Sequence, residues 1–408
     1  MPQRSVVMIG STLVVASLAL AGCGSRSDNA GSGGGSDSGG KVVTIGVIAP
    51  LSGDLAALGK GIQNSVDLGI RQANESKAVP GWTIKMSAQD DEAKPDVGKN
   101  AATKLASDDT VIGVVGTLNS SVAQSVQPVL AAADIAQISP ANTNPSLTKG
   151  ADFATSPKRT YPGYFRTCTT DAIQGPFAAQ YLFNKAGIKE VATIHDKKTY
   201  GQGLAEAFAA EFEKLGGKVV SKETINPDDD KYDAVISKVK PTNPGAVYYG
   251  GEYPQAGPLS QQMKAAGLNV PLMGGDGIFD PKFIELAGAT SNGDLATSVG
   301  APTETLDSAK AFVEAYGKAG FSEPYGAYGA YAYDAAQAII EGMKVSLKDA
   351  TSVKDARKAT IEAIGKVSFE GATGTVSFDE FGDTTNRVLT VYVVEGGKWV
   401  AKLTDTFK

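Results

Sequence analysis

Histidine and cysteine are scarce in this chain: His195 is the only histidine, and Cys23 and Cys168 are the only cysteines. One histidine excludes any site that needs two, such as an HExxH zinc motif, and the cysteines form no cluster with metal-ligand spacing. Asp196 follows His195, but no G-x-S-x-G sequence supplies the nucleophile of a hydrolase triad. We therefore expect a hydrogen-bonded structural role for His195, and no metal, no cofactor and no catalysis.

Basic clusters and late hydrophobic runs are also missing. The chain has 38 Lys and Arg against 44 Asp and Glu, which gives a formal net charge of −6 at pH 7. The sequence shows no basic patch of the kind that binds nucleic acid. Beyond the start of the chain, no apolar stretch approaches the length of a membrane-spanning helix. We expect no nucleic-acid partner and a body of ordinary globular composition.

The one long apolar run lies at the start of the chain. It extends from Val6 to about Ala21 behind Arg4, and it ends in Leu-Ala-Gly-Cys at Leu20–Cys23. This pattern is typical of a secretory signal peptide, residues 1–22. Its ending resembles the lipobox of bacterial lipoproteins, in which the cysteine receives a diacylglycerol. The alternative is a chance cysteine at the end of a buried helix.

A linker follows the predicted lipidation site. Residues 23–40 consist almost wholly of Gly, Ser, Asp and Asn after Cys23, a composition that has little to bury. Such a coil has ends that lie roughly 20–25 Å apart. We expect Cys23 to anchor the protein on the extracytoplasmic face of a membrane. Cys168 is then left without an intramolecular partner, and the fold without a disulfide.

From residue 41 onward, short β-type runs alternate with amphipathic stretches of helical length. The first series has strands at 42–49, 82–88, 110–116 and 136–139 and helices at 56–76, 94–106 and 121–133. The second series begins after a strand at 164–167, with strands at 191–195, 218–223, 246–249 and 271–274 and helices at 203–215, 232–239 and 255–266. Serial strand–helix–strand units indicate parallel sheets with helices on both faces. The sequence predicts an α/β fold with two lobes of like architecture.

The last part of the chain changes pattern. A strand at 295–299 precedes helices near 305–319, 327–345 and 353–364, and the end is all β, with strands at 374–378, 386–394 and 398–403. A chain that builds one lobe, then the other, and then returns would connect the lobes through several parallel linkers. That layout forms a hinge.

Polar turns follow several strands of the first series. Residues 53–60 (GDLAALGK) fail as a phosphate loop, because five residues separate the glycines and Gly61 stands where Ser or Thr should bind magnesium. The segment 116–121 (GTLNSS) opens a helix, where Ser120 is either a plain N-cap or, with free N–H groups, part of an anion site. The segment 139–145 (SPANTNP) follows the next strand at the same sheet edge. Two adjacent turns rich in hydroxyls and amides suit a carboxylate ligand.

Two turns of the second series carry further candidates. Tyr200 follows the strand 191–195 and offers a ring face or a hydroxyl toward a cleft. Asp276 ends another strand among glycines, and it is either an Asx-turn residue or the counter-ion of an ammonium group. A tyrosine series at helical spacing indicates mainly core and interface packing; it comprises Tyr325, Tyr328, Tyr331 and Tyr333.

Six segments, in order along the chain, resemble the leucine/isoleucine/valine-binding family of periplasmic receptors that serve ABC importers. They are IGVIAPLSG (45–53), GTLNSS (116–121), ISPANTNPSLT (138–148), IHDKKTYGQG (194–203), VYYGGEYPQ (247–255) and MGGDG (273–277). The resemblance implies the type I periplasmic-binding-protein fold, with two α/β lobes, a hinge of three crossing segments and one ligand in the cleft. We expect an N-terminal lobe of residues 41–166 plus about 301–375, and a C-terminal lobe of residues 167–300 plus about 376–408.

The resemblance also implies roles for single residues. The Ser120 hydroxyl and backbone would meet the carboxylate of a bound amino acid, and the Ala141 carbonyl and Thr143 hydroxyl would hold its ammonium. From the second lobe, Tyr200 would close on the ligand and Asp276 would balance the ammonium. A zwitterion buried between lobes needs donors at one end and acceptors at the other, because unpaired buried charge is costly.

The sequence departs from the family at several places. Leu58 stands where an aromatic residue often borders the side-chain pocket, and Glu252, followed by Tyr253, stands where Tyr is usual. Ala93 and Asn119 stand at the positions of a disulfide found in the best-known members. A Glu252 that faces the cleft would favour a more polar or cationic ligand. The further candidates for ligand contact are Leu58, Ser121, Glu252, Tyr253 and Tyr328.

These features predict a monomeric, lipid-anchored receptor that captures a small amino acid, with Leu, Ile and Val first. It would pass the ligand to the permease and ATPase subunits of an ABC importer. A ligand that touches both lobes only in the closed form drives hinge closure. The alternatives are a sensor of the same fold, a receptor for another amino acid, a short amide or urea, and a surface hydrolase that uses Asp, Glu or Ser in the cleft.

Overall fold

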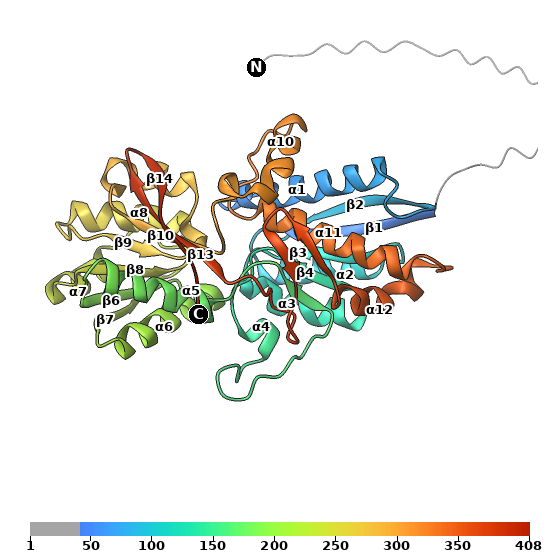
Figure 1. Cartoon of the computed structure of the whole chain (residues 1–408). Coiled ribbons are helices and arrows are strands. Elements are labelled where there is room, and N and C mark those ends of the chain that lie inside the picture. Colours follow the sequence, from blue (N-terminus) through green and yellow to red (C-terminus); the bar gives the residue numbers. More distant parts are fainter. Residues whose placement is uncertain (1–40) are drawn as a thin grey trace, which may run out of the picture. The chain divides into compact units, whose positions relative to one another are not determined.

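The computed structural model describes residues 41–408 (Figure 1). The predicted signal peptide, the predicted lipidated Cys23 and the linker to residue 40 lie outside the described residues, so these features stay predictions. Within residues 41–408, no helix combines the length and the apolar composition that crossing a bilayer requires.

A five-stranded parallel sheet forms from the first part of the chain. Its strand order is β2-β1-β3-β4-β5. The inner strand β3 is buried along its whole length, because it is apolar on both faces and covered on both sides. The strands are β1 (Lys41–Ala49), β2 (Trp82–Asp90), β3 (Val111–Gly116), β4 (Ala136–Ser139) and β5 (Tyr164–Arg166).

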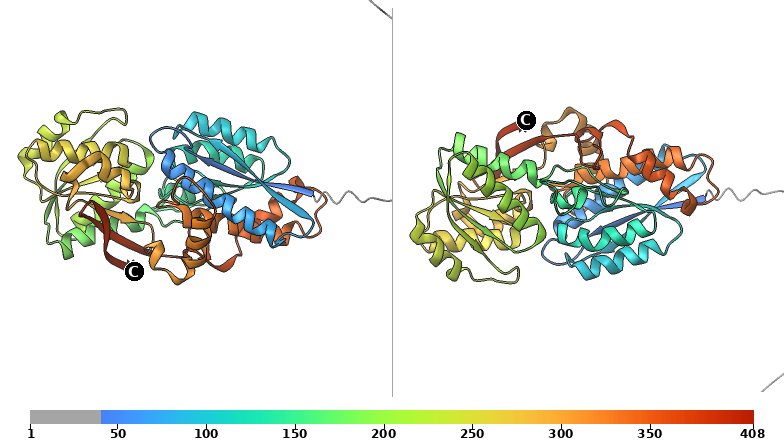
Figure 2. Two further views of the ribbon diagram at one scale, coloured as in Figure 1. Left: turned by 90° about the horizontal axis from the view of Figure 1, so that it is seen from above. Right: turned by 90° about the horizontal axis from the view of Figure 1, so that it is seen from below.

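Helices from two distant parts of the sequence cover this sheet. Gly113 of β3 lets Ile339 of a late helix approach, since a Cβ there would lie 3.1 Å from it. Arg357 of another late helix donates to the Val111 carbonyl at 2.9 Å. Figures 1 and 2 show these orange and red helices beside the blue and cyan elements. The helices are α1 (Ala56–Glu75), α2 (Pro95–Ala106), α3 (Ser120–Ala132), α4 (Ser146–Lys149), α10 (Lys310–Lys318), α11 (Gly329–Ser346) and α12 (Val353–Ile364). The five-stranded sheet and these helices are called the first lobe.

A seven-stranded mixed sheet forms the second lobe, in the order β14-β13-β10-β9-β8-β6-β7. Strands β6 to β10 are parallel, whereas β13 and β14 form an antiparallel hairpin added beside β10. The strands are β6 (Glu190–His195), β7 (Lys218–Thr224), β8 (Ala246–Gly250), β9 (Leu272–Gly274), β10 (Leu295–Ser298), β13 (Val388–Glu395) and β14 (Lys398–Thr406). The helices are α5 (Asp171–Gln180) with a π-helical turn at Tyr181–Lys185, α6 (Thr199–Lys214), α7 (Asp233–Val239), α8 (Tyr253–Ala265) and α9 (Pro281–Ala287).

The chain passes between the two sheets three times: after β5, after β10 and before β13. A small hairpin of β11 (Ser368–Gly371) and β12 (Gly374–Ser377) precedes the last passage. The predicted α/β fold, with two lobes of parallel sheets flanked by helices, is confirmed. The residue boundaries that we assign to the two lobes stay predictions.

The largest difference from the predicted elements is α5, which the sequence pattern did not reveal. Gly175 and Pro176 lie inside this helix and disfavour helix in the sequence. Gly175 is needed because α5 packs closely on α6: a Cβ at this position would lie 2.7 Å from the Phe208 amide nitrogen. The helix α9 and the strand β11 were also missed, and α10 begins later than predicted, after two 3₁₀ turns.

Candidate functional site

The candidate site lies where the carboxyl ends of strands from both lobes face each other. Ser120 begins α3 after β3, and Ala141 and Thr143 follow β4. On the other side, Tyr200 follows β6 and Asp276 follows β9. In open α/β sheets, ligands bind at this edge. All five side chains are buried, and Tyr200, the most exposed of them, shows only 7% of its surface.

Asp276 is held by three donors from three elements. Its Oδ1 accepts from the Tyr200 hydroxyl at 2.8 Å and from Gln174 Nε2 at 2.9 Å, and its Oδ2 accepts from the Tyr328 hydroxyl at 2.7 Å. Tyr328 precedes α11 of the first lobe, so this bond joins the lobes. Burial raises the pKa of Asp276, and the three donors offset that rise only in part. In this conformation, donors from both lobes fix the position of the carboxylate.

Gln174 and Gly277 complete the support of this carboxylate. Gln174 Oε1 accepts from the Asp276 amide at 2.8 Å and from the Thr297 hydroxyl at 2.7 Å. The Gly277 amide donates to the Tyr200 hydroxyl at 3.0 Å. Gln174 and Tyr200 are therefore held in defined orientations by these bonds. Their positions in turn fix the orientation of the Asp276 carboxylate.

Asp171 is a second buried carboxylate that sequence reasoning missed. It is the first residue of α5, it is fully buried, and its amide donates to the Thr143 carbonyl at 2.8 Å. Neither carboxylate oxygen makes a hydrogen bond of full geometry within residues 41–408, although the nearby Thr143 hydroxyl favours the ionised form and lowers the pKa in part. Burial raises the pKa of Asp171 well above its ordinary value, and the Asp276 carboxylate adds to the rise. An unpaired buried carboxylate is costly, so this group is suited to a cation.

The first-lobe side offers hydroxyls instead of carboxylates. Ser120 Oγ is buried and has no hydrogen-bond partner in the described part of the chain, and the buried Thr143 Oγ1 lies near the Asp171 carboxylate without a hydrogen bond of full geometry. Ser120 also stands in the first turn of α3, where backbone N–H groups are free to bind an anion. Ser121 beside it is more exposed than Ser120. The Ser120 hydroxyl and these amides form a donor-rich end, whereas Thr143, whose carbonyl accepts from the Asp171 amide at 2.8 Å, lies beside the carboxylates. The two ends of the site therefore have opposite polarity.

Arg166 fixes the loop that carries Ala141 and Thr143. This fully buried residue donates from Nη1 to the Asn142 and Asn144 carbonyls at 2.6 and 3.0 Å. Its Nε pairs with Asp383 at 2.7 Å, in the segment that leads to the third passage between the sheets. Burial favours the protonated form of Asp383, but the Arg166 and Lys149 charges hold the pKa of Asp383 below its ordinary value. The loop is therefore anchored by a buried ion pair.

Glu252, one of the further candidates, is already paired. Its Oε1 accepts from Asn119 Nδ2 at 2.6 Å, across the lobes, and its Oε2 accepts from Lys198 Nζ at 2.9 Å. The side chain borders a groove of about 650 Å³ whose lining comes from both lobes and includes Asp54 and Asp228. Because Lys198 supplies the counter-charge, Glu252 does not call for a cationic ligand.

Tyr253 and Leu58 have different surroundings. The Tyr253 hydroxyl donates to the Asp54 carbonyl of the first lobe, so it is a contact between lobes. Leu58 is buried in α1, and its Cδ2 would lie 3.7 Å from a Cβ added at Gly326. It therefore packs near the turn that leads to Tyr328.

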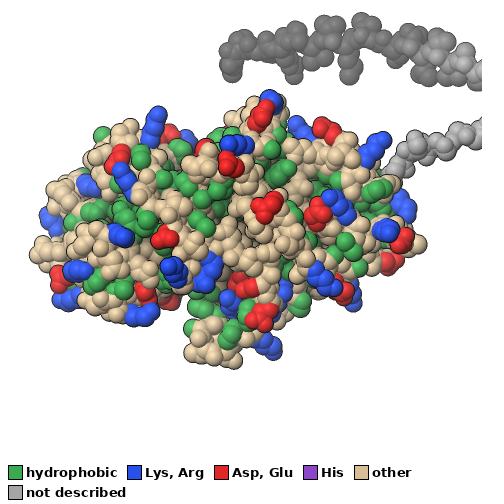
Figure 3. All heavy atoms as spheres, in the orientation of Figure 1, with side chains coloured by type: hydrophobic (Ala, Val, Ile, Leu, Met, Phe, Trp, Pro, Cys, Tyr) green, Lys and Arg blue, Asp and Glu red, His purple; other side chains and the backbone are tan. Residues whose placement is uncertain are grey.

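His195 and Cys168 lie in surroundings typical of structural residues. His195 is half-buried, its Nδ1 accepts from the Lys197 amide at 3.1 Å, and burial lowers its pKa. Cys168 is fully buried, and burial raises the pKa of its thiol. Within residues 41–408, no group of three or more His, Cys, Asp and Glu is placed to hold a metal. On the face shown in Figure 3, basic and acidic side chains are interspersed.

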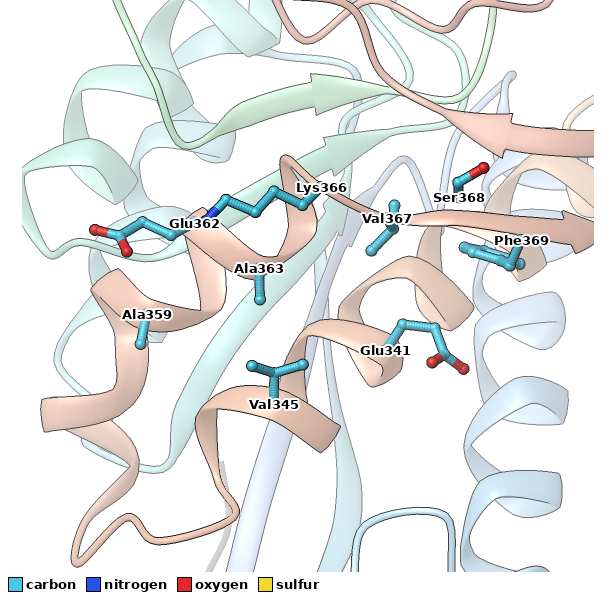
Figure 4. Close-up of a pocket in the computed structure, with 9 residues that line it drawn as sticks. All are labelled: Glu341, Val345, Ala359, Glu362, Ala363, Lys366, Val367, Ser368 and Phe369. Atoms are coloured by element: carbon cyan, nitrogen blue, oxygen red, sulfur yellow. The ribbon is translucent and has the colours of Figure 1, made fainter.

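A separate surface groove lies away from this site. Figure 4 shows a groove of about 410 Å³ between α11, α12 and the start of β11. Glu341 and Val345 line it from α11, and Glu362 and Ala363 from α12. It contains none of the candidate residues named above, and it opens on the outer side of the first lobe.

Comparison with known proteins gives a family model that covers nearly the whole described chain. The model described as "Periplasmic binding protein" matches residues 42–398. The Leu/Ile/Val-binding protein BraC3 of Rhizobium johnstonii is 32% identical over 359 residues, which cover 88% of this chain and 93% of that relative. The Leu/Ile/Val-binding protein homolog 1 of Brucella suis is 33% identical over 355 residues, which cover 87% of this chain and 91% of the relative.

Solved structures agree with this match. A leucine-binding protein from Thermotoga maritima has a TM-score of 0.78 and 27% identity, and the match covers 89% of this chain and 99% of that one. A branched-chain amino acid transporter substrate-binding protein from Streptococcus pneumoniae, solved in complex with isoleucine, has a TM-score of 0.77 and 26% identity. That match covers 90% of this chain and 99% of the other.

Proposed function

Because the chain belongs to the periplasmic binding protein family, we propose that it is the receptor of an ABC importer for a small zwitterionic amino acid. It is a binding protein and not an enzyme. Leu, Ile and Val are the first candidates for the ligand. The relatives named for Leu, Ile and Val, and the structure solved with isoleucine, support this choice.

The observation that carries the proposal is the opposite polarity of the two ends of the site. The Ser120 hydroxyl and the first amides of α3 suit the ligand carboxylate. The carboxylates of Asp171 and Asp276 suit the ammonium, together with the Ala141 carbonyl and the Thr143 hydroxyl. A zwitterion matches both ends, whereas a plain amine or a plain acid leaves one end unpaired.

The mechanism follows from the distribution of these groups over two lobes. Ser120, Ala141 and Thr143 belong to the first lobe, and Asp171, Tyr200 and Asp276 belong to the second. A ligand that contacts both sets binds the closed form better than the open form, and this difference drives closure. The importer would then recognise the closed receptor.

The proposal also concerns where the protein is located and how it is attached to the membrane. The family places the receptor outside the cytoplasm. A lipid on Cys23 would hold it at the membrane surface, and we expect the receptor to be a monomer. A tether of this kind raises the effective concentration of the receptor near its permease and ATPase partners.

A thermal-shift screen of the purified protein tests the proposal. The panel contains the free amino acids, short amides and urea. A ligand at a hundred times its dissociation constant adds about 2.7 kcal/mol of stability. We expect the largest shifts with Leu, Ile and Val. The absence of a shift with every amino acid would contradict the proposal, and a shift with urea or an amide alone would assign another solute.

A further inference from the structure

Asn119 and Glu252 form a buried hydrogen bond between the lobes. Asn119 lies in the turn between β3 and α3 of the first lobe, and Glu252 precedes α8 of the second. Their atoms Nδ2 and Oε1 are 2.6 Å apart, and the two residues are 3% exposed each. Hydrogen bonds to a charged group are stronger than neutral ones, and burial protects this one from competing water.

Lys198 completes the group from the second lobe. Its Nζ lies 2.9 Å from Glu252 Oε2 and 3.9 Å from Asp196 Oδ2. Burial lowers the pKa of Lys198, but the carboxylates of Glu252 and Asp196 outweigh burial and raise it. Lys198 therefore stays cationic, and both oxygens of Glu252 have donors from the protein itself.

We propose that Asn119, Glu252 and Lys198 form a latch that stabilises the closed form independently of which ligand is bound. This inference rests on the proposed function and names three residues that set affinity without touching the ligand. The bond between Asn119 and Glu252 breaks when the lobes separate, so it contributes to the closed form alone. Apparent affinity scales with the fraction of protein in the binding-competent form. The latch then changes the affinity for every ligand by one common factor.

An exposed hydrogen bond between the lobes shows how much less such a bond contributes to closure when water competes for it. The Thr199 hydroxyl is 3.1 Å from Gln124 Oε1, but this pair is exposed to solvent. Water competes for both partners there, so the bond contributes little to closure. Gln124→Ala is therefore a matched control that removes an interlobe hydrogen bond of the exposed kind.

A direct contact between Asn119 and the ligand would also lower affinity when Asn119 is replaced, and it has to be distinguished from the latch. Asn119 Oδ1 is buried and has no hydrogen-bond partner among residues 41–408, so it is available for a direct contact with a ligand. A direct contact would respond to the size and shape of the ligand. A latch would not.

The test is calorimetric titration of the full protein with leucine, valine and alanine. We expect Asn119→Ala to weaken all three by the same factor of about ten, which corresponds to roughly 1.4 kcal/mol. Gln124→Ala should change each affinity less than about twofold, in line with its exposure. An Asn119→Ala protein with unchanged affinities, or with factors that differ more than about threefold among the ligands, would overturn the latch.

Lys198→Met is a second test of the latch, in case Asn119→Ala does not fold. Asn119 makes no side-chain cap bond to α3, so its loss should leave the ligand-free thermal midpoint unchanged. Lys198→Met keeps the apolar stem and removes the counter-charge of Glu252, and we expect it to weaken all three ligands by one common factor. Unequal or absent losses in Lys198→Met would overturn the latch as well. If the unmodified protein binds none of the three, the proposed function fails instead.

Discussion

The polar groups on the two sides of the lobe interface differ in how far the protein itself satisfies them. On the first-lobe side, the buried Ser120 and Thr143 hydroxyls make no hydrogen bond of full geometry in the described chain. On the second-lobe side, Asp276 already has three donors, and Glu252 has two. Neutral hydroxyls tolerate an unmade hydrogen bond at modest cost, whereas buried carboxylates need partners. In this conformation the carboxylates of Asp276 and Glu252 are satisfied by the protein, and we propose that a ligand completes the contacts of the hydroxyls.

Asp171 is the exception that sharpens this comparison. It lies on the acidic side, yet among residues 41–408 neither of its oxygens has a cationic partner or a hydrogen bond of full geometry. Its raised pKa lets it carry a proton when no cation is near. Asp276 thus provides a fixed acceptor, and Asp171 provides one whose charge depends on the ligand.

The largest expected effect comes from removing the fixed acceptor. Asp276→Asn removes one of the two carboxylates proposed to face the ammonium and places an amide among the Tyr200 and Tyr328 hydroxyls. We expect affinity for leucine to fall on the order of 100-fold, or about 2.7 kcal/mol, by calorimetric titration. Asp280→Asn is the control, because this nearby Asp caps α9 and lies outside the site. Equal losses in both variants would contradict a specific role for Asp276.

A smaller effect is expected on the hydroxyl side. Ser120→Ala removes one neutral donor to the ligand carboxylate, while the first amides of α3 remain. We expect affinity to fall about tenfold, near the lower end for a bond between a neutral donor and a charged acceptor. Ser121→Ala is the matched neighbour and should change affinity less than twofold. If Ser121→Ala were the more damaging variant, the assignment of Ser120 would be wrong.

The smallest effect concerns pH and separates the two carboxylates. Burial raises the pKa of both Asp171 and Asp276 in the ligand-free protein. A bound ammonium favours their ionised forms, so binding releases protons and affinity falls as pH decreases. For one released proton the fall cannot exceed about tenfold per pH unit. We expect a roughly threefold fall per unit between pH 7 and pH 5, and a flatter profile for Asp171→Asn. A profile that Asp171→Asn leaves unchanged would exclude Asp171 as the titrating group.

Sequence reasoning captured the fold well because its signals are local. Buried strands such as β3 are apolar on both faces, and the glycine pair at Gly396 and Gly397 marks the hairpin of β13 and β14. The polar turns after β3, β4, β6 and β9 were located from the same alternation, because each follows directly on a predicted strand. That parallel strands bring such turns to one edge is a general property of the fold.

The residues that were missed depend on tertiary packing. Asp171 and Gln174 lie in α5, whose Gly175 and Pro176 hide the helical pattern, although Thr170 followed by Asp171 is a usable helix-start signal. The partner of Glu252 was also out of reach, because Asn119 is 133 positions away in the sequence. Two positions at which the sequence departs from its resemblance, Asn119 and Glu252, turn out to contact each other.

The most direct test of the account compares leucine with two analogues that each lack one charged end. 3-Methylbutylamine has no carboxylate, and 4-methylpentanoate has no ammonium, while both keep the branched side chain. Calorimetric titration should give affinities at least about 100-fold weaker than leucine for both analogues, since each leaves one end of the site unpaired. An analogue that binds within about threefold of leucine would contradict the claim that the two ends of the site bind the two charged ends of a zwitterion.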